Sequence, residues 1–199
     1  MATTAEKVRE LRDKTGAGVM DCKEALAASN EDMEQAVDFL RKKGLAAASK
    51  RAHREARDGV VSSYIHAGAK LGVLIEVNCE TDFVARTEQF QELVKRLAMQ
   101  VAAANPQWVS RDQVPPDVIE REREIYRQQM ADQKKPPQVL EKIIEGKLSK
   151  FYEDQCLVDQ AYIRDSSGKL RVAELVAQVS AQTGEKIAIR RFVRFQVGE

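Results

Sequence analysis

Residues 60–78 of the chain read VVSSYIHAGAKLGVLIEVN, and this segment predicts a β-hairpin. Its two apolar runs, 60–66 and 71–78, flank a short segment with Gly68, and glycine is typical of tight turns because it tolerates positive φ angles. The second run is almost continuously apolar. We therefore expect it to form a strand in the middle of a sheet.

Two further segments complete the predicted core. Residues 87–104 have the apolar spacing of a long amphipathic helix that ends before Asn105 and Pro106, and we expect this helix to cover the sheet. Residues 187–197 alternate in the manner of a strand. The alternation predicts one face with Ile187, Ile189, Val193, Phe195 and Val197, interrupted by Arg191, and an opposite face with Arg190, Arg194 and Gln196.

The segments between these elements predict more helices. Residues 117–152 contain two runs with apolar stripes, separated by Pro136 and Pro137, which is typical of a projecting antiparallel helical hairpin. A short strand is expected within 156–163 and a helix over 172–182. Together the pattern predicts an α+β fold, with helices on one side of an antiparallel sheet of three or four strands.

The N-terminal part predicts a module of three short helices. A turn at 16–18 separates the first two helices, Asp21 and Glu24 resemble a capping box at the start of the second, and Gly44 is expected to end the third. The predicted domains are a three-helix module over 1–44, a basic linker over 45–57 and an α+β core over 58–199.

Composition narrows the class of protein. The chain has 199 residues with 43% hydrophobic and 32% charged side chains, which favours a folded globular protein over a disordered one. No run approaches the roughly 18 uncharged apolar residues of a membrane-spanning helix, and the first residues lack the apolar stretch of a secretion signal. We therefore expect a cytoplasmic protein without a membrane partner. The three scattered cysteines are expected to be small buried side chains.

The charge pattern leaves two interpretations of one segment open. The net charge of +1 disfavours a globally basic nucleic-acid-binding protein, yet residues 41–57 contain seven basic side chains and one acidic side chain. A solvated linker is the simpler interpretation, because this run has no aromatic residues for base stacking. The alternative is an RNA-associated module that binds phosphates.

Patterns typical of enzymes are few. His53 and His66 have no further metal ligands at suitable spacing, and the glycines at 16–18 lack the context of a phosphate-binding loop. Cys79 lacks the sequence context of a thiol enzyme. The sequence thus predicts no catalytic residue, no metal site and no cofactor, with a cysteine-dependent enzyme as the remaining alternative.

Residues 78–86, NCETDFVAR, leave the predicted central strand and enter a helix, which places them at an exposed corner. Two interpretations stay open. In the first, favoured by periodicity, Thr81 or Asp82 caps one helical turn and Phe83 closes the core beneath it. In the second, Phe83 anchors a partner protein and Asp82 is its polar neighbour.

Three parts of the chain resemble bacterial-type elongation factor Ts. They are residues 15–26 (TGAGVMDCKEAL), residues 78–86, and residues 189–192 (IRRF) followed by 195–199 (FQVGE). The resemblance runs over essentially the whole chain in the same order. It implies a nucleotide exchange factor, not an enzyme, that binds the translational GTPase elongation factor Tu in its GDP-bound and nucleotide-free forms.

The resemblance also implies which residues contact that partner. The N-terminal module is expected to be similar to a ubiquitin-associated domain and to dock on the G domain of the partner through Arg12, Val19, Met20 and Lys23. An element that enters near the nucleotide and dislodges magnesium is matched by Thr81, Asp82, Phe83 and Val84. Second contacts, toward another domain of the partner, are matched by His66, Thr183 and Gly184.

The number of core elements resembles that of the short family members, which act as dimers. The chain has one predicted hairpin, one long helix and one terminal strand, where long members have two related core halves. We therefore expect a homodimer that pairs core sheets, so that the contact regions on one partner come from different subunits. No direct contact with nucleic acid is expected.

Overall fold

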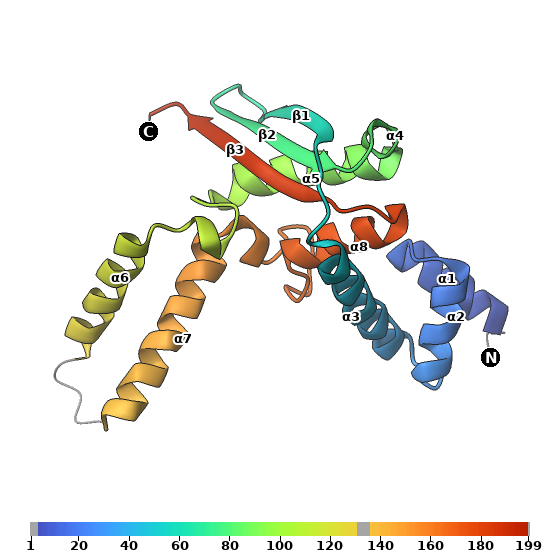
Figure 1. Cartoon of the computed structure of the whole chain (residues 1–199), viewed down its shortest axis with the longest axis horizontal. Helices are drawn as coiled ribbons and strands as arrows, with labels where there is room; N and C mark the ends of the chain where they lie inside the picture. Colours follow the sequence, from blue (N-terminus) through green and yellow to red (C-terminus); the bar gives the residue numbers. More distant parts are fainter. Residues whose placement is uncertain (1–3, 131–135, 199) are drawn as a thin grey trace.

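The computed structural model describes residues 4–130 and 136–198, and within them three strands form one antiparallel sheet. The strands are β1 (Asp58–Ile65), β2 (Leu71–Cys79) and β3 (Ala188–Gln196), with β2 in the centre. The predicted hairpin and its central strand are therefore confirmed. The sheet is the upper layer in Figure 1 and the helices lie below it, as expected for this α+β fold.

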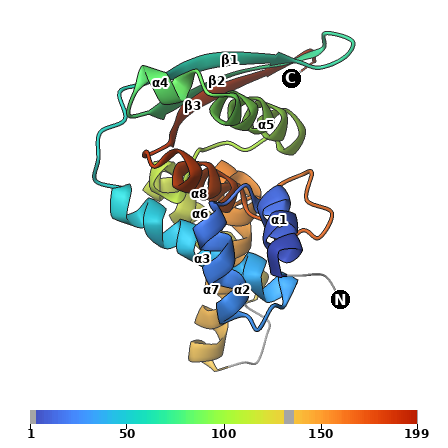
Figure 2. The same cartoon turned by 90° about the vertical axis from the view of Figure 1, so that its right-hand side faces the viewer.

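One long helix, α5 (Glu88–Ala104), covers the lower face of the sheet, as predicted. Thr87 caps its start by accepting a hydrogen bond from the Phe90 N–H at 3.4 Å, and Asn105 ends it with a left-handed φ of 44°. The helix α8 (Val172–Thr183) lies beneath α5 and closes the same core (Figure 2). The largest side chains of this main core include Ile75, Val77, Phe90, Leu93 and Leu97.

A β-bulge in β3 corrects the predicted alternation. Val77 pairs with Ile189, but Glu76 pairs with Arg191, so Arg190 is an extra residue in the strand. One extra residue moves every later side chain to the other face. The prediction of a common apolar face is therefore wrong: Ile187, Ile189 and Phe192 lie on the core side, whereas Val193, Phe195 and Val197 are exposed.

The arginines of β3 change sides for the same reason. Arg194 lies on the core side of the sheet, where its Nε donates to the Ala102 carbonyl oxygen at 3.4 Å. Arg191, expected to interrupt an apolar face, lies on the outer face and pairs with Glu76 at 2.7 Å. Arg191, which interrupts the apolar alternation in the sequence, thus directly follows the bulge residue Arg190.

Three helices precede the sheet: α1 (Thr4–Thr15), α2 (Val19–Ala28) and α3 (Met33–Arg51), and they share a small core. Two predicted boundaries are wrong. α2 begins at Val19, so Asp21 lies inside the helix and binds Lys43 Nζ at 2.8 Å. α3 continues through the buried Gly44, because packing against α8 stabilises the longer helix. The division into three domains stays a prediction.

A helical hairpin projects from the body, as predicted (Figure 1, lower left). It consists of α6 (Pro116–Gln129) and α7 (Pro137–Gln155), joined by a cluster of buried side chains that includes Met130, Ile144 and Leu148. A 3-10 turn, η1 (Arg111–Gln113), precedes it. Within the described ranges, none of the helices combines the length and apolarity needed to span a bilayer.

The strand expected within 156–163 does not form. This segment contains a 3-10 turn, η2 (Leu157–Asp159), and two isolated bridges, Cys156 to Trp108 and Ala161 to Arg171. Backbone N–H groups of the turn donate to carbonyl oxygens of Trp108 and Val109 at 2.9 and 3.0 Å. The segment therefore satisfies its backbone without entering a sheet.

Candidate functional site

A sharp corner connects β2 with α5, and α4 (Asp82–Ala85) forms one helical turn within it. Thr81 caps this turn, because its hydroxyl oxygen accepts a hydrogen bond from the Val84 N–H at 3.3 Å. Val84 and Ala85 are buried in the main core. The turn is thus anchored from its inner side, and of the two predicted caps, Thr81 and Asp82, the structure shows Thr81.

The outer side of the corner presents Asp82 and Phe83 to solvent. Phe83 is 77% exposed, so the interpretation that it closes the core is wrong, and Val84 fills that position. Asp82 pairs with Arg86 at 2.8 Å in an exposed ion pair. An exposed aromatic side chain on a rigid corner is typical of an anchor for a protein partner.

The end of α8 lies against this corner. Gly184 ends α8 with a φ of 74°, and the Thr183 hydroxyl donates to the Val179 carbonyl oxygen of its own helix at 2.9 Å. Glu185, which follows Gly184, accepts hydrogen bonds from the backbone N–H groups of Glu80 and Thr81 at 3.0 and 3.1 Å. The structure therefore brings the predicted segments 81–84 and 183–184 together. Sequence reasoning missed Glu185, because its partners lie more than a hundred residues away.

His66, the remaining predicted second contact, lies at the opposite end of the sheet. It follows β1 at the hairpin turn, where its Nδ1 lies 2.9 Å from the Tyr64 hydroxyl. The nine residues of β2 separate this turn from the corner, a length of about 27 Å. Within one chain, His66 is therefore remote from Phe83.

The predicted contact residues of the N-terminal module are exposed around the turn between α1 and α2. Met20 is 74% exposed, and Val19, Lys23 and Arg12 also face solvent. Lys23 makes no ion pair within the part of the chain that the structure describes. The next turn of α2 buries Cys22 and Ala25, so this helix presents one side to its own core and the other to solvent.

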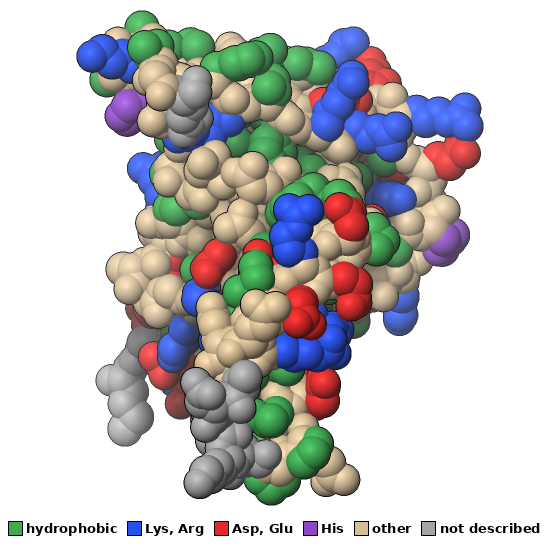
Figure 3. All heavy atoms as spheres, turned by 90° about the vertical axis from the view of Figure 1, so that its left-hand side faces the viewer, with side chains coloured by type: hydrophobic (Ala, Val, Ile, Leu, Met, Phe, Trp, Pro, Cys, Tyr) green, Lys and Arg blue, Asp and Glu red, His purple; other side chains and the backbone are tan. Residues whose placement is uncertain are grey.

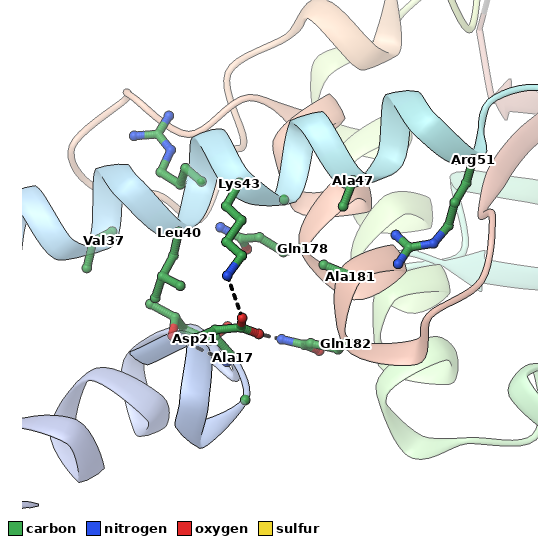
Figure 4. Close-up of a pocket in the computed structure, with 14 residues that line it drawn as sticks. Ala17, Asp21, Val37, Leu40, Lys43, Ala47, Arg51, Gln178, Ala181 and Gln182 are labelled. Atoms are coloured by element: carbon green, nitrogen blue, oxygen red, sulfur yellow. Dashed lines mark hydrogen bonds and ion pairs between the residues drawn. The ribbon is translucent and has the colours of Figure 1, made fainter. Parts of the chain in front are cut away.

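A cavity of about 260 Å³ lies at the joint between the N-terminal helices and α8 (Figure 4). Lys43 of α3 reaches across it to Asp21 of α2, and Gln182 of α8 donates to the Thr15 carbonyl oxygen at 3.0 Å. Nearby, Arg41 of α3 pairs with Glu174 of α8. The Gln182 and Arg41 contacts hold the N-terminal helices against α8, whereas the Lys43–Asp21 pair joins α3 to α2.

The basic run at 41–57 is largely engaged within the chain. Four of its seven basic side chains form ion pairs, namely Arg41, Lys43, Arg54 and Arg57. Side chains that already neutralise carboxylates have less charge to offer phosphates. The absence of a nucleic-acid contact stays a prediction.

The thiol groups are poorly suited to nucleophilic chemistry. Cys22, Cys79 and Cys156 are buried and free. Burial raises the pKa of Cys79 and of Cys156 to about 11, so their reactive thiolate forms are scarce at neutral pH. Among the described residues, no group of three or more potential metal ligands comes together.

Apart from the Glu76–Arg191 ion pair, the outer sheet face is largely apolar. We use this name for the exposed side chains of Val61, Ile65, Leu74, Val193, Phe195 and Val197. Figure 3 shows hydrophobic side chains gathered along the top of the molecule, over the sheet. Phe195 is 68% exposed. Contiguous apolar surface of this kind is typical of a protein-binding face.

These features define an α+β protein whose candidate sites are exposed surfaces. A family model described as Elongation factor TS matches residues 5–199. Elongation factor Ts of Fervidobacterium nodosum is 54% identical over 199 residues, with 100% of both chains covered. That of Thermodesulfovibrio yellowstonii is 55% identical over 199 residues, which cover 100% of this chain and 98% of the relative. The chain belongs to the elongation factor Ts family, and its role lies in translation elongation.

Proposed function

We propose that the chain is a guanine nucleotide exchange factor for elongation factor Tu. It binds the GDP-bound partner, displaces magnesium and promotes GDP release, so that GTP can bind. The observation that carries this proposal is the exposed Phe83 on a corner with a buried inner side, in a member of the elongation factor Ts family.

Thermodynamic linkage explains how binding alone can release a nucleotide. A factor that binds the nucleotide-free partner more tightly than the GDP-bound partner must weaken GDP binding by the same ratio. Magnesium neutralises much of the charge of the diphosphate, so its displacement removes a large part of the nucleotide affinity. The factor then needs no general base and no metal ligand, and it makes or breaks no covalent bond.

Each predicted contact region has a part in this proposal. Segment 81–84 is the element that enters near the nucleotide, with Phe83 as its anchor and Asp82 as the polar neighbour. The exposed residues Arg12, Val19, Met20 and Lys23 dock the N-terminal module on the G domain. His66, Thr183 and Gly184 are second contacts with another domain of the partner.

A homodimer is part of the same proposal. The outer sheet face offers apolar side chains that a second copy of the sheet would cover. His66 and Phe83 lie at opposite ends of one sheet, so different subunits supply the contacts on one partner molecule. The proposal places the chain in the cytoplasm, with no membrane and no direct nucleic-acid contact.

Nucleotide release tests the exchange function directly. A fluorescent GDP analogue is bound to elongation factor Tu with magnesium, and its release is followed in excess unlabelled GDP with and without this chain. We expect the wild type to accelerate release markedly. Phe83→Ala should reduce this acceleration at least about tenfold, because aromatic anchors dominate binding energy. Ile163→Ala, which shortens another exposed apolar side chain, serves as the control.

Two outcomes would contradict the proposal. A folded wild-type chain that does not accelerate release from a compatible partner would overturn the exchange function. Acceleration that Phe83→Ala leaves unchanged would overturn the role of the corner. Binding to RNA that weakens steeply with salt and survives Phe83→Ala would instead favour the RNA-associated alternative.

A further inference from the structure

Four charged side chains join three distant segments at the corner. We call Arg54, Glu80, Glu185 and Lys186 the corner clamp. They come from the connection after α3, the segment between β2 and α4, and the loop between α8 and β3. The clamp touches the backbone of the corner that carries Phe83.

Glu185 holds the corner from the side of α8. One carboxylate oxygen, Oε2, accepts the N–H groups of Glu80 and Thr81 at 3.0 and 3.1 Å. The other, Oε1, accepts the Thr81 hydroxyl at 2.7 Å. A single carboxylate therefore binds three donors of the two residues that precede α4. Hydrogen bonds to a charged acceptor are stronger than those between neutral groups.

The Glu80 side chain in turn accepts hydrogen bonds from Lys186 and Arg54. Its Oε1 accepts the backbone N–H of Lys186 at 2.6 Å and Arg54 Nη1 at 3.3 Å. Lys186 Nζ in turn donates to the carbonyl oxygens of Ala52 and Arg54 at 2.7 and 2.8 Å. The corner, the loop after α8 and the connection to the N-terminal helices are thus tied to one another.

The corner needs such support because α4 is only one turn long. An isolated helical turn is unstable, so its orientation depends on the contacts that flank it. Val84 and Ala85 supply one anchor in the core. Phe83 is exposed and has little packing of its own, so the direction of its side chain follows the direction of the backbone at Thr81.

We propose that Glu185 is a positioning residue for nucleotide exchange. It orients Asp82 and Phe83 before the partner binds, and the rest of the clamp fixes this orientation relative to the N-terminal module. The inference rests on the proposed exchange function. Without Glu185 the corner samples other directions, and ordering it on the partner costs free energy that otherwise drives magnesium displacement.

The test compares Glu185→Ala with Glu185→Gln and with the control Glu55→Ala. Glu185→Ala removes all three hydrogen bonds. Glu185→Gln keeps an amide oxygen for the two N–H groups and is the conservative rescue. Glu55→Ala removes an exposed ion pair with Arg57, in the same connection but outside the clamp. Glu185→Asp keeps the charge on a shorter side chain and carries the test if Glu185→Ala does not fold.

Two readouts separate the clamp from the exchange function. The first is hydrogen exchange of the Glu80 and Thr81 amides, measured by NMR on the chain alone. The second is GDP-analogue release from elongation factor Tu, giving a maximal rate and a half-saturating concentration. For Glu185→Ala we expect faster amide exchange and a maximal rate about tenfold lower, since small misplacements of a functional group are costly. We expect the half-saturating concentration to change much less, because the N-terminal module still docks.

The remaining variants complete the prediction. Glu185→Gln and Glu55→Ala should stay within about threefold of wild type in both readouts, since a neutral acceptor keeps much of the bond and exposed ion pairs contribute little. Glu185→Asp should fall between wild type and Glu185→Ala.

Each contrary result overturns a specific statement. Unchanged amide exchange in Glu185→Ala, or in Glu185→Asp if that variant is used, overturns the clamp. Faster amide exchange with an unchanged maximal rate overturns the positioning role. A wild-type chain that does not accelerate release overturns the proposed function, while the amide measurement still judges the clamp by itself.

Discussion

On the lower face of β2, Val73, Ile75 and Val77 are buried against α5, whereas on the upper face of the same strand Leu74 is exposed beside Val193. Both faces are apolar, and they differ in whether the chain supplies a covering layer. The lower face contributes to folding of the single chain. The upper face leaves its hydrophobic free energy available for association, which the proposed homodimer would use. Hydropathy alone does not distinguish the two uses.

We expect the largest loss of stability from a substitution on the covered face of the sheet. Leu97→Ala removes a fully buried side chain of α5 and leaves a cavity, so the free energy of unfolding should fall by about 2–5 kcal/mol. Urea unfolding followed by circular dichroism measures this. Lys95→Ala, at an exposed position of the same helix, should stay within about 0.5 kcal/mol of wild type. Equal losses in both variants would contradict the assignment of this core.

A polar change in the same core should have a smaller effect. Gln100 is buried; its Nε2 donates to the Gln160 side chain and the Ala161 carbonyl, each at 3.1 Å, and its Oε1 accepts the Ile163 N–H at 2.9 Å. Gln100→Leu leaves these groups without partners and should cost about 1–3 kcal/mol of unfolding free energy.

The matched control for this change is Gln89→Leu at an exposed position of α5. It should leave the unfolding free energy nearly unchanged in the same urea experiment. If Gln100→Leu proves as stable as wild type, burial alone governs this region and the buried hydrogen bonds contribute nothing.

The exposed face should respond differently. Val61→Asp lies on the outer sheet face, so the unfolding free energy should change by less than about 1 kcal/mol. Self-association should weaken at least about tenfold, because a charge would enter the proposed interface. Sedimentation measures the dissociation constant, and Val139→Asp on α7 is the control at another exposed valine. A stability loss like that of Leu97→Ala would show that the outer face serves the single chain.

The smallest effect concerns an ion pair on the outer side. A hydrogen bond from Arg191 lowers the pKa of Glu76. A lowered acid pKa stabilises the fold above the unfolded-state value of about 4.3, and this stabilisation is lost as pH falls through the folded-state pKa. The unfolding free energies of Glu76→Gln and Arg191→Gln should therefore lie below that of the wild type at pH 7 and converge with it in acid. Urea unfolding at several pH values measures this. A difference that persists at low pH would assign the effect to packing.

Sequence patterns predicted most elements but missed where some begin, end and turn. The hairpin, α5, α8 and the helical hairpin followed from local periodicity. The third helix does not end at Gly44, because packing on α8 outweighs the local preference of a glycine. The bulge at Arg190 leaves no periodic signal in the sequence. Arg191, a charged residue in an apolar alternation, is the one irregularity next to it.

The candidate site was predicted in part. A cap at Thr81 or Asp82 was correctly expected, and it is Thr81, since capping depends on residues only three positions apart. Periodicity favoured Phe83 as the side chain that closes the core, with a partner anchor as the alternative, and the structure buries Val84 there instead, because one helical turn is too short to define a periodic face. The contribution of Glu185 was not predicted, since its hydrogen bonds reach back 104 and 105 residues.

The sequence by itself determined most types of element, the central strand and the family resemblance, because periodicity, turn residues and motifs are properties of neighbouring positions. The tertiary structure decided which apolar face is covered, which side of the corner carries Phe83 and how the corner clamp joins three segments. Those features depend on contacts between distant residues, and such contacts form only when the whole chain has packed.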